Sequence, residues 1–131
     1  MQCDDKDGRI DQGDNMKLQN SLHYDNGLIK FILEQAGCDT SLDFTLVVES
    51  LSVELAAQCG EGTRGLMFEV NGTYYVQVDN GAGLDILAHE LKHVEQYVSG
   101  LGEWLRAERE LTAYEDRWYE AEANVFGSKW R

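Results

Sequence analysis

The chain contains no proline, and it has only three histidines and three cysteines. Without a proline-rich linker or a repeat, nothing in the sequence divides it into two domains. Cys3, Cys38 and Cys59 are far apart and form no C-x-x-C pair, which argues against a disulfide framework and predicts reduced structural thiols. No apolar run approaches the roughly 18 residues that span a bilayer, and the first residues lack the features of a secretory signal. We therefore expect a cytoplasmic protein with no membrane partner.

Basic residues are also scarce. Eleven Lys and Arg stand against 24 Asp and Glu, which gives a net charge of −13. Such a chain repels polyanions, so nucleic acid is not expected as a partner. Long-range attraction would instead favour basic peptides or basic protein surfaces as partners.

The length and composition predict one folded domain with an acidic head. The 131 residues are enough for one core, and 43% of them are hydrophobic. Residues 1–20 are rich in Asp and Gly and nearly without large apolar side chains, which is typical of a flexible segment. The single domain is then expected over residues 21–131.

The hydrophobic pattern predicts a mixture of helices and strands. We expect a helix over 28–36, a strand near 44–49, and a β-hairpin over 66–78, where Asn71-Gly72 supplies a two-residue turn. Residues 51–62 stay ambiguous. A helix is expected over 84–98, since apolar residues recur there every three or four positions until Ser99-Gly100. A C-terminal helical stretch places Trp118, Ala121 and Val125 on its apolar side.

The helix expected over 84–98 contains the sequence His89-Glu90-Leu91-Lys92-His93, an H-E-x-x-H motif. Residues four apart on a helix differ by about 40° around the axis and about 6 Å along it, so both imidazoles can reach one metal ion. Glu90 is then placed to act as general base on a metal-activated water. His89, Glu90 and His93 lie on the side opposite the apolar residues, which is hard to explain by core packing. The motif predicts a Zn²⁺ site.

A catalytic zinc site needs three protein ligands, and the motif provides two. His23 is the remaining histidine, and it lies in a polar stretch where another role is favoured. The residue types alone leave several downstream acids open as third ligand: Glu103, Glu108, Glu110, Glu115, Asp116, Glu120 and Glu122.

The segment WYEAEANVFG, residues 118–127, resembles the glutamate helix of the gluzincin metallopeptidases. Its sequence is also similar to that of the ImmA/IrrE-like group and of compact phage-type minigluzincins. This resemblance implies that Glu120 is the third zinc ligand and that Asn124 supports a ligand histidine. Helical spacing agrees, because Glu120, Asn124 and Gly127 share a face, whereas Glu122 points about 200° away from Glu120.

Other roles near the site are less defined. Tyr114 and Arg117 are candidates for stabilising an oxyanion, although a core position and an ion pair explain them more simply. In metallopeptidases of this design, an edge strand beside the motif holds the substrate in extended form by strand addition. Residues 73–79 are the candidate, with Tyr74, Tyr75, Val76 and Gln77 at the centre.

The sequence thus predicts an α+β, zincin-like fold: a small, mainly antiparallel sheet packed against the H-E-x-x-H helix and a C-terminal helix that carries Glu120. The expected activity is zinc-dependent hydrolysis of peptide bonds in a peptide or protein substrate. Two alternatives stay open. One is a catalytically inactive module that binds zinc or another protein, and the other is an acidic inhibitor or mimic protein.

Overall fold

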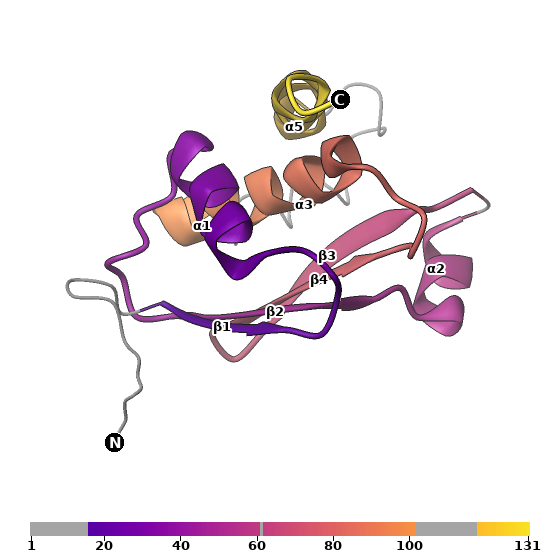
Figure 1. Ribbon diagram of the computed structural model, residues 1–131, viewed down its shortest axis with the longest axis horizontal. Coiled ribbons are helices and arrows are strands. Elements are labelled where there is room, and N and C mark those ends of the chain that lie inside the picture. The colour runs from indigo at the N-terminus through magenta and orange to yellow at the C-terminus, as the bar shows by residue number, and fades with distance from the viewer. Residues whose placement is uncertain (1–15, 61, 102–117) are drawn as a thin grey trace.

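The computed structural model describes residues 16–60, 62–101 and 118–131. Within these ranges the protein is α+β, with one four-stranded sheet and a layer of helices over one of its faces (Figure 1). The strands are β1 (Lys17–Asn20), β2 (Thr45–Ser50), β3 (Gly65–Val70) and β4 (Thr73–Val78). The helices are α1 (Asn26–Gln35), α2 (Val53–Cys59), α3 (Leu84–Gln96) and α5 (Trp118–Ser128). A kinked segment, Tyr97–Leu101, follows α3, with Gly100 at a φ of 92°.

The sheet is mixed, which corrects the expectation of a mainly antiparallel one. Its strand order is β1-β2-β4-β3. β2 runs parallel to both β1 and β4, and the β3–β4 hairpin is the antiparallel pair. The hairpin was predictable from its turn, where Asn71 and Gly72 have φ values of 51° and 84°. The parallel pairs join strands that are distant in the sequence, and no local signal specifies them.

The strand order also corrects the expectation about the substrate strand. Residues 73–79 were expected at an exposed edge, but β4 lies inside the sheet and pairs with both β2 and β3. Its backbone groups are therefore engaged, and Tyr74 to Gln77 cannot accept an added strand. Among the described strands, β3 and β1 form the edges.

The predicted acidic head extends too far toward the domain. Lys17–Asn20, expected within the flexible segment, form β1 and pair with β2. Met16 and Leu18 pack against the hydrophobic core, which explains why these residues are ordered despite their polar neighbours. Residues 1–15 lie outside the described part of the chain.

The core lies between the sheet and the helices α1 and α3, which cover the same face (Figure 1). One buried cluster contains Ile29, Ile32 and Leu33 of α1 together with Leu87, Leu91 and Val94 of α3, and all six are 0% exposed. The Asp25 side chain caps α1 by accepting a hydrogen bond from the Leu28 N–H at 3.1 Å. Apolar spacing thus fixes which side of α3 faces the sheet, and its other side is left for α5.

Helix α5 packs on α3 as a third layer, away from the sheet (Figure 1). Tyr119, Ala123, Phe126 and Gly127 are its buried residues. The expected apolar side was wrong, since Trp118 and Val125 are 42% and 62% exposed and Ala121 is exposed too. None of the helices in the described ranges is both long and apolar enough to cross a membrane.

Candidate metal centre

The α3 helix brings the two motif histidines together on the side that faces α5. The His89 and His93 Nε2 atoms are 3.2 Å apart, with the rings almost perpendicular at 82°. This follows from their spacing, because residues one turn apart project from the same side of a helix. His93 is buried at 8% exposed, and His89 is partly buried.

Helix α5 adds a carboxylate to this pair. Glu120 Oε1 is 3.2 Å from His89 Nε2 and 3.1 Å from His93 Nε2. The three donor atoms form a cluster that could hold a metal ion. Glu120 comes from a segment 27 residues after His93, so only the packing of α5 on α3 creates the third position.

Glu122 does not join the cluster, as its position on the helix predicted. Its carboxylate accepts a hydrogen bond from Gln96 Nε2 at 2.9 Å and lies 3.8 Å from Lys92 Nζ. His23 is also elsewhere, with its ring 4.4 Å from that of Tyr24. Glu115, Asp116 and the oxyanion candidates Tyr114 and Arg117 lie outside the described residues.

The electrostatics of the cluster favour a positive charge between its members. Burial lowers the pKa of His93, but the hydrogen bond to Glu120 and the charges of Glu90 and Glu120 outweigh it, so the net pKa is raised. For Glu120, burial raises the pKa, while the hydrogen bonds with His89 and His93 and their charges lower it far below its usual range. The carboxylate is therefore ionised and available as a ligand.

A close approach of the two helices sets the position of Glu120. A Cβ at Gly127 would lie 2.7 Å from the Asp85 carbonyl oxygen and 3.3 Å from the His89 Cβ. Because Gly127 has no side chain, α5 can lie against the first turns of α3. The sequence predicted this close approach from the shared face of Glu120 and Gly127.

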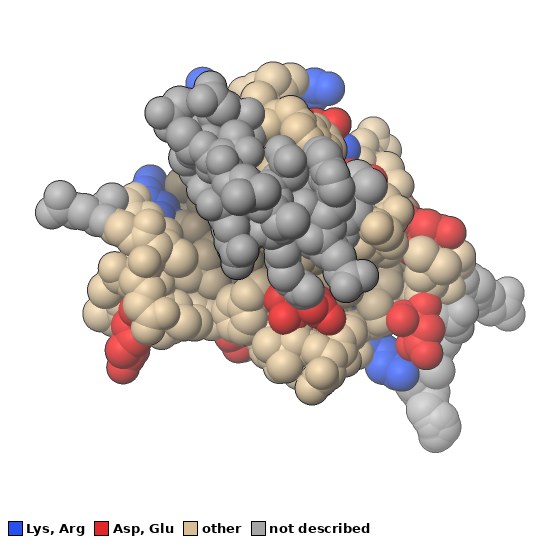
Figure 2. Space-filling view, turned by 180° about the vertical axis from the view of Figure 1, so that it is seen from behind, with Lys and Arg blue, Asp and Glu red and all other residues tan. Residues whose placement is uncertain are grey.

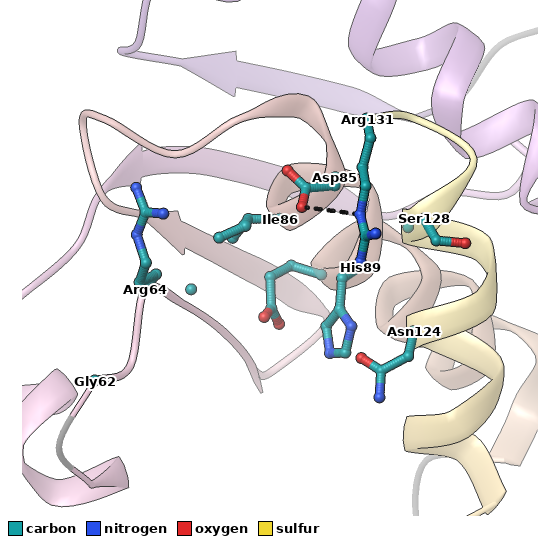
Figure 3. Close-up of a pocket in the computed structure, with 11 residues that line it drawn as sticks. Gly62, Arg64, Asp85, Ile86, His89, Asn124, Ser128 and Arg131 are labelled. Atoms are coloured by element: carbon teal, nitrogen blue, oxygen red, sulfur yellow. Dashed lines mark ion pairs between the residues drawn. The ribbon is translucent and has the colours of Figure 1, made fainter.

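A surface pocket of about 400 Å³ opens beside His89 and Glu90. Figure 3 shows His89 and Asn124 pointing into it from α3 and α5, with Arg64 on the opposite side and Arg131 next to Asp85. The Arg131 guanidinium lies 3.9 Å from the Asp85 carboxylate. Glu90 is 7% exposed, and its carboxylate lies next to Gly65, where a Cβ would be 3.1 Å from Oε2.

The sequence did not point to the residue that contacts the other ring nitrogen of His93. Asn124 is exposed and lines the pocket with His89. It is Gln96 whose Oε1 lies 2.8 Å from His93 Nδ1. Sequence reasoning missed Gln96, although its position three residues after His93 placed it on the same side of the helix.

Comparison of the chain with protein-family models, with curated proteins and with solved structures found no match.

Proposed function

We propose that this protein is a zinc-dependent peptidase with a zincin-like site, in which His89, His93 and Glu120 hold the metal and Glu90 is the general base. One observation carries the proposal. Three donor atoms from two helices converge within 3.2 Å of one another, next to a pocket that also contains the Glu of the H-E-x-x-H motif.

The donor set suits zinc. Imidazole nitrogen and carboxylate oxygen bind zinc at about 2.0–2.2 Å, so ligands of a tetrahedral ion lie about 3.3 Å apart. The three separations of 3.1 to 3.2 Å are close to this value. Three protein ligands also leave one position for a water or substrate oxygen, as in catalytic rather than structural zinc sites. Bound there, zinc would act as a Lewis acid and make a water molecule more acidic.

Glu90 supplies the proton transfers in this proposal. Its carboxylate accepts a proton from the attacking water and then gives it to the nitrogen of the leaving amine. Its burial beside Gly65 and Ile86, at the pocket that His89 also lines, limits the bulk water around it. A substrate carbonyl group in the pocket would therefore lie close to both the metal ligands and the base.

The substrate would be an extended peptide or an unfolded protein segment. We place its strand on β3 instead of β4, because β3 is the sheet edge that begins beside Glu90. Arg64 and Arg131 balance Asp85 and Glu90 around the pocket, so the pocket itself does not select a basic side chain. A preference for basic substrates would instead come from the net charge of −13, with acidic side chains at several separate places in Figure 2.

Zinc content and hydrolysis, measured on the same samples, test the proposal. Wild-type protein reconstituted with zinc should bind one ion per chain and cleave a labelled unfolded protein. Glu90→Gln should keep the zinc and the fold but lose cleavage by a factor of at least about 100, because the amide keeps the shape and lacks the basic oxygen. Glu34→Gln on the exposed side of α1 is the matched control and should cleave normally.

Three outcomes would contradict parts of the proposal. Wild-type protein without zinc would remove the metal centre altogether and leave the acidic inhibitor or mimic as the alternative. Zinc binding without cleavage of any unfolded substrate would leave a zinc-binding or protein-interaction module. Cleavage by Glu90→Gln at the wild-type rate would remove Glu90 from the mechanism.

A further inference from the structure

Gln96 lies at the end of α3 and is almost fully buried, at 1% exposed. A buried amide is costly unless its hydrogen-bonding groups have partners, so its contacts define its orientation. Gln96 Nε2 donates to the backbone carbonyl of Tyr119 at 3.0 Å and to the Glu122 carboxylate at 2.9 Å. Both partners are acceptors, and a flipped amide would point its oxygen at them. The nitrogen therefore faces α5, and Oε1 faces His93.

This orientation decides which nitrogen of His93 carries the proton. Gln96 Oε1 can only accept a hydrogen bond, and it lies 2.8 Å from His93 Nδ1. Nδ1 must therefore be the protonated nitrogen. In a neutral imidazole the lone pair is then on Nε2, which faces Glu120 Oε1 and His89 Nε2. A metal cation bound by the Nε2 atoms of His89 and His93 and by Glu120 Oε1 would accept this lone pair.

The same side chain also joins the two helices of the site. Tyr119, whose carbonyl receives the Gln96 hydrogen bond, directly precedes Glu120 on α5. The contact on α3 is made three residues after His93. The Gln96 amide thus holds both the imidazole ring of His93 and the backbone next to Glu120.

We propose that Gln96 is the positioning residue of the metal centre: it holds His93 with Nε2 free to bind metal and anchors the start of α5 so that Glu120 meets both histidines. This inference rests on the three-ligand site of the proposed function and is independent of hydrolysis. Partners that orient metal-bound histidines typically change metal affinity by about 10- to 100-fold when removed.

Zinc affinity, measured by competition with a chromophoric chelator, is the first test. Gln96→Leu has a similar volume but no hydrogen bonds, and it should weaken binding about 10- to 100-fold. Val94→Ala is the matched control, because it removes buried volume from the hydrophobic core side of α3 and removes no hydrogen bond to His93. It should lower the melting temperature and leave zinc affinity within about threefold of wild type.

A double variant separates positioning from simple packing. In Gln96→Glu with Glu122→Gln, a carboxylate oxygen accepts from His93 Nδ1 and the new amide at 122 can donate to that carboxylate, but the hydrogen bond to the Tyr119 carbonyl stays lost. Zinc affinity should therefore recover in part, to a value between that of Gln96→Glu, which sets two carboxylates against each other, and that of wild type. Equal affinities for wild type and Gln96→Leu would overturn the proposal.

Imidazole nitrogen NMR gives a readout that needs no zinc. In metal-free Glu120→Ala at about pH 9, imidazole is neutral and no Glu120 carboxylate competes for its proton. His93 should then carry its proton on Nδ1. When Gln96→Leu is added, Nδ1 loses its acceptor and the proton should move to Nε2. Protonation at Nε2 in Glu120→Ala itself would overturn the proposal. If wild type binds no zinc, the proposed function fails, while this experiment still decides whether Gln96 determines which nitrogen of His93 is protonated.

Discussion

Gly127 of α5 lies against Asp85 of α3 so closely that a Cβ at position 127 would be 2.7 Å from the Asp85 carbonyl oxygen. The contact is at the level of His89, whose Cβ would lie 3.3 Å from the added atom. Since the neighbour is backbone, it cannot turn aside as a flexible side chain would. The short distance between the two helices depends on the absence of a side chain at Gly127, and this distance determines how close Glu120 comes to the histidines.

Gly127→Ala is therefore expected to separate the helices. We expect a loss of about 1–3 kcal/mol in the free energy of unfolding, as for other overpacked positions. Zinc affinity should fall as well, because Glu120 moves with α5. Chelator competition and thermal melting measure the two effects, with Ser128→Ala as the neighbouring control. A variant with wild-type zinc affinity would show that the metal centre tolerates a shift of α5.

The assignment of the third ligand predicts opposite results for two neighbouring acids. Glu120→Ala should lose most of its zinc affinity, since it removes one of three ligands. Glu122→Ala keeps all three and removes a hydrogen-bond partner of Gln96, so it should lose at most about tenfold. Isothermal titration with zinc distinguishes them. A stronger loss in Glu122→Ala would mean that α5 is rotated from the arrangement described.

Zinc binding should weaken in acid through His93. Burial opposes protonation of this ring, but Glu120 and Glu90 outweigh it and raise the pKa. A protonated imidazole cannot bind zinc, so affinity is full above the raised pKa and is lost as pH falls through it. The loss should begin above about pH 6.5, the ordinary histidine value. Affinities measured from about pH 8 to pH 5 check this, and a decline confined to lower pH would contradict it.

Cys38 should be inert toward thiol reagents in the folded protein. Burial, together with the nearby charges of Glu95 and Asp39, raises its pKa to about 12. Cys59 is exposed and should react quickly. In a Cys3→Ser background, an aromatic disulfide reagent should label one thiol rapidly and the second after unfolding. Two rapid reactions would show that the α1 end of the core opens easily.

The sequence alone located the parts of the site that lie within one element. His89, Glu90 and His93 are fixed relative to one another by helical geometry, and apolar spacing showed which side of α3 faces the core. The Asn71-Gly72 turn likewise predicted the hairpin, because its positive φ angles are a local property. The resemblance to gluzincins points to Glu120, which the structure brings close to His89 and His93.

Only the tertiary structure decided how those elements meet. β4 lies inside the sheet because it pairs in parallel with β2. α2 and β3 lie between these two strands in the sequence, so no local sequence pattern predicts the pairing. The expected apolar face of α5 was wrong, because the helix turns Gly127 toward α3 and leaves Trp118 and Val125 exposed. Gln96 had no recognisable motif, since its role depends on a carbonyl from another helix. Local periodicity predicts that an element forms, whereas the packing of distant segments determines which of its faces is buried and which side chains meet.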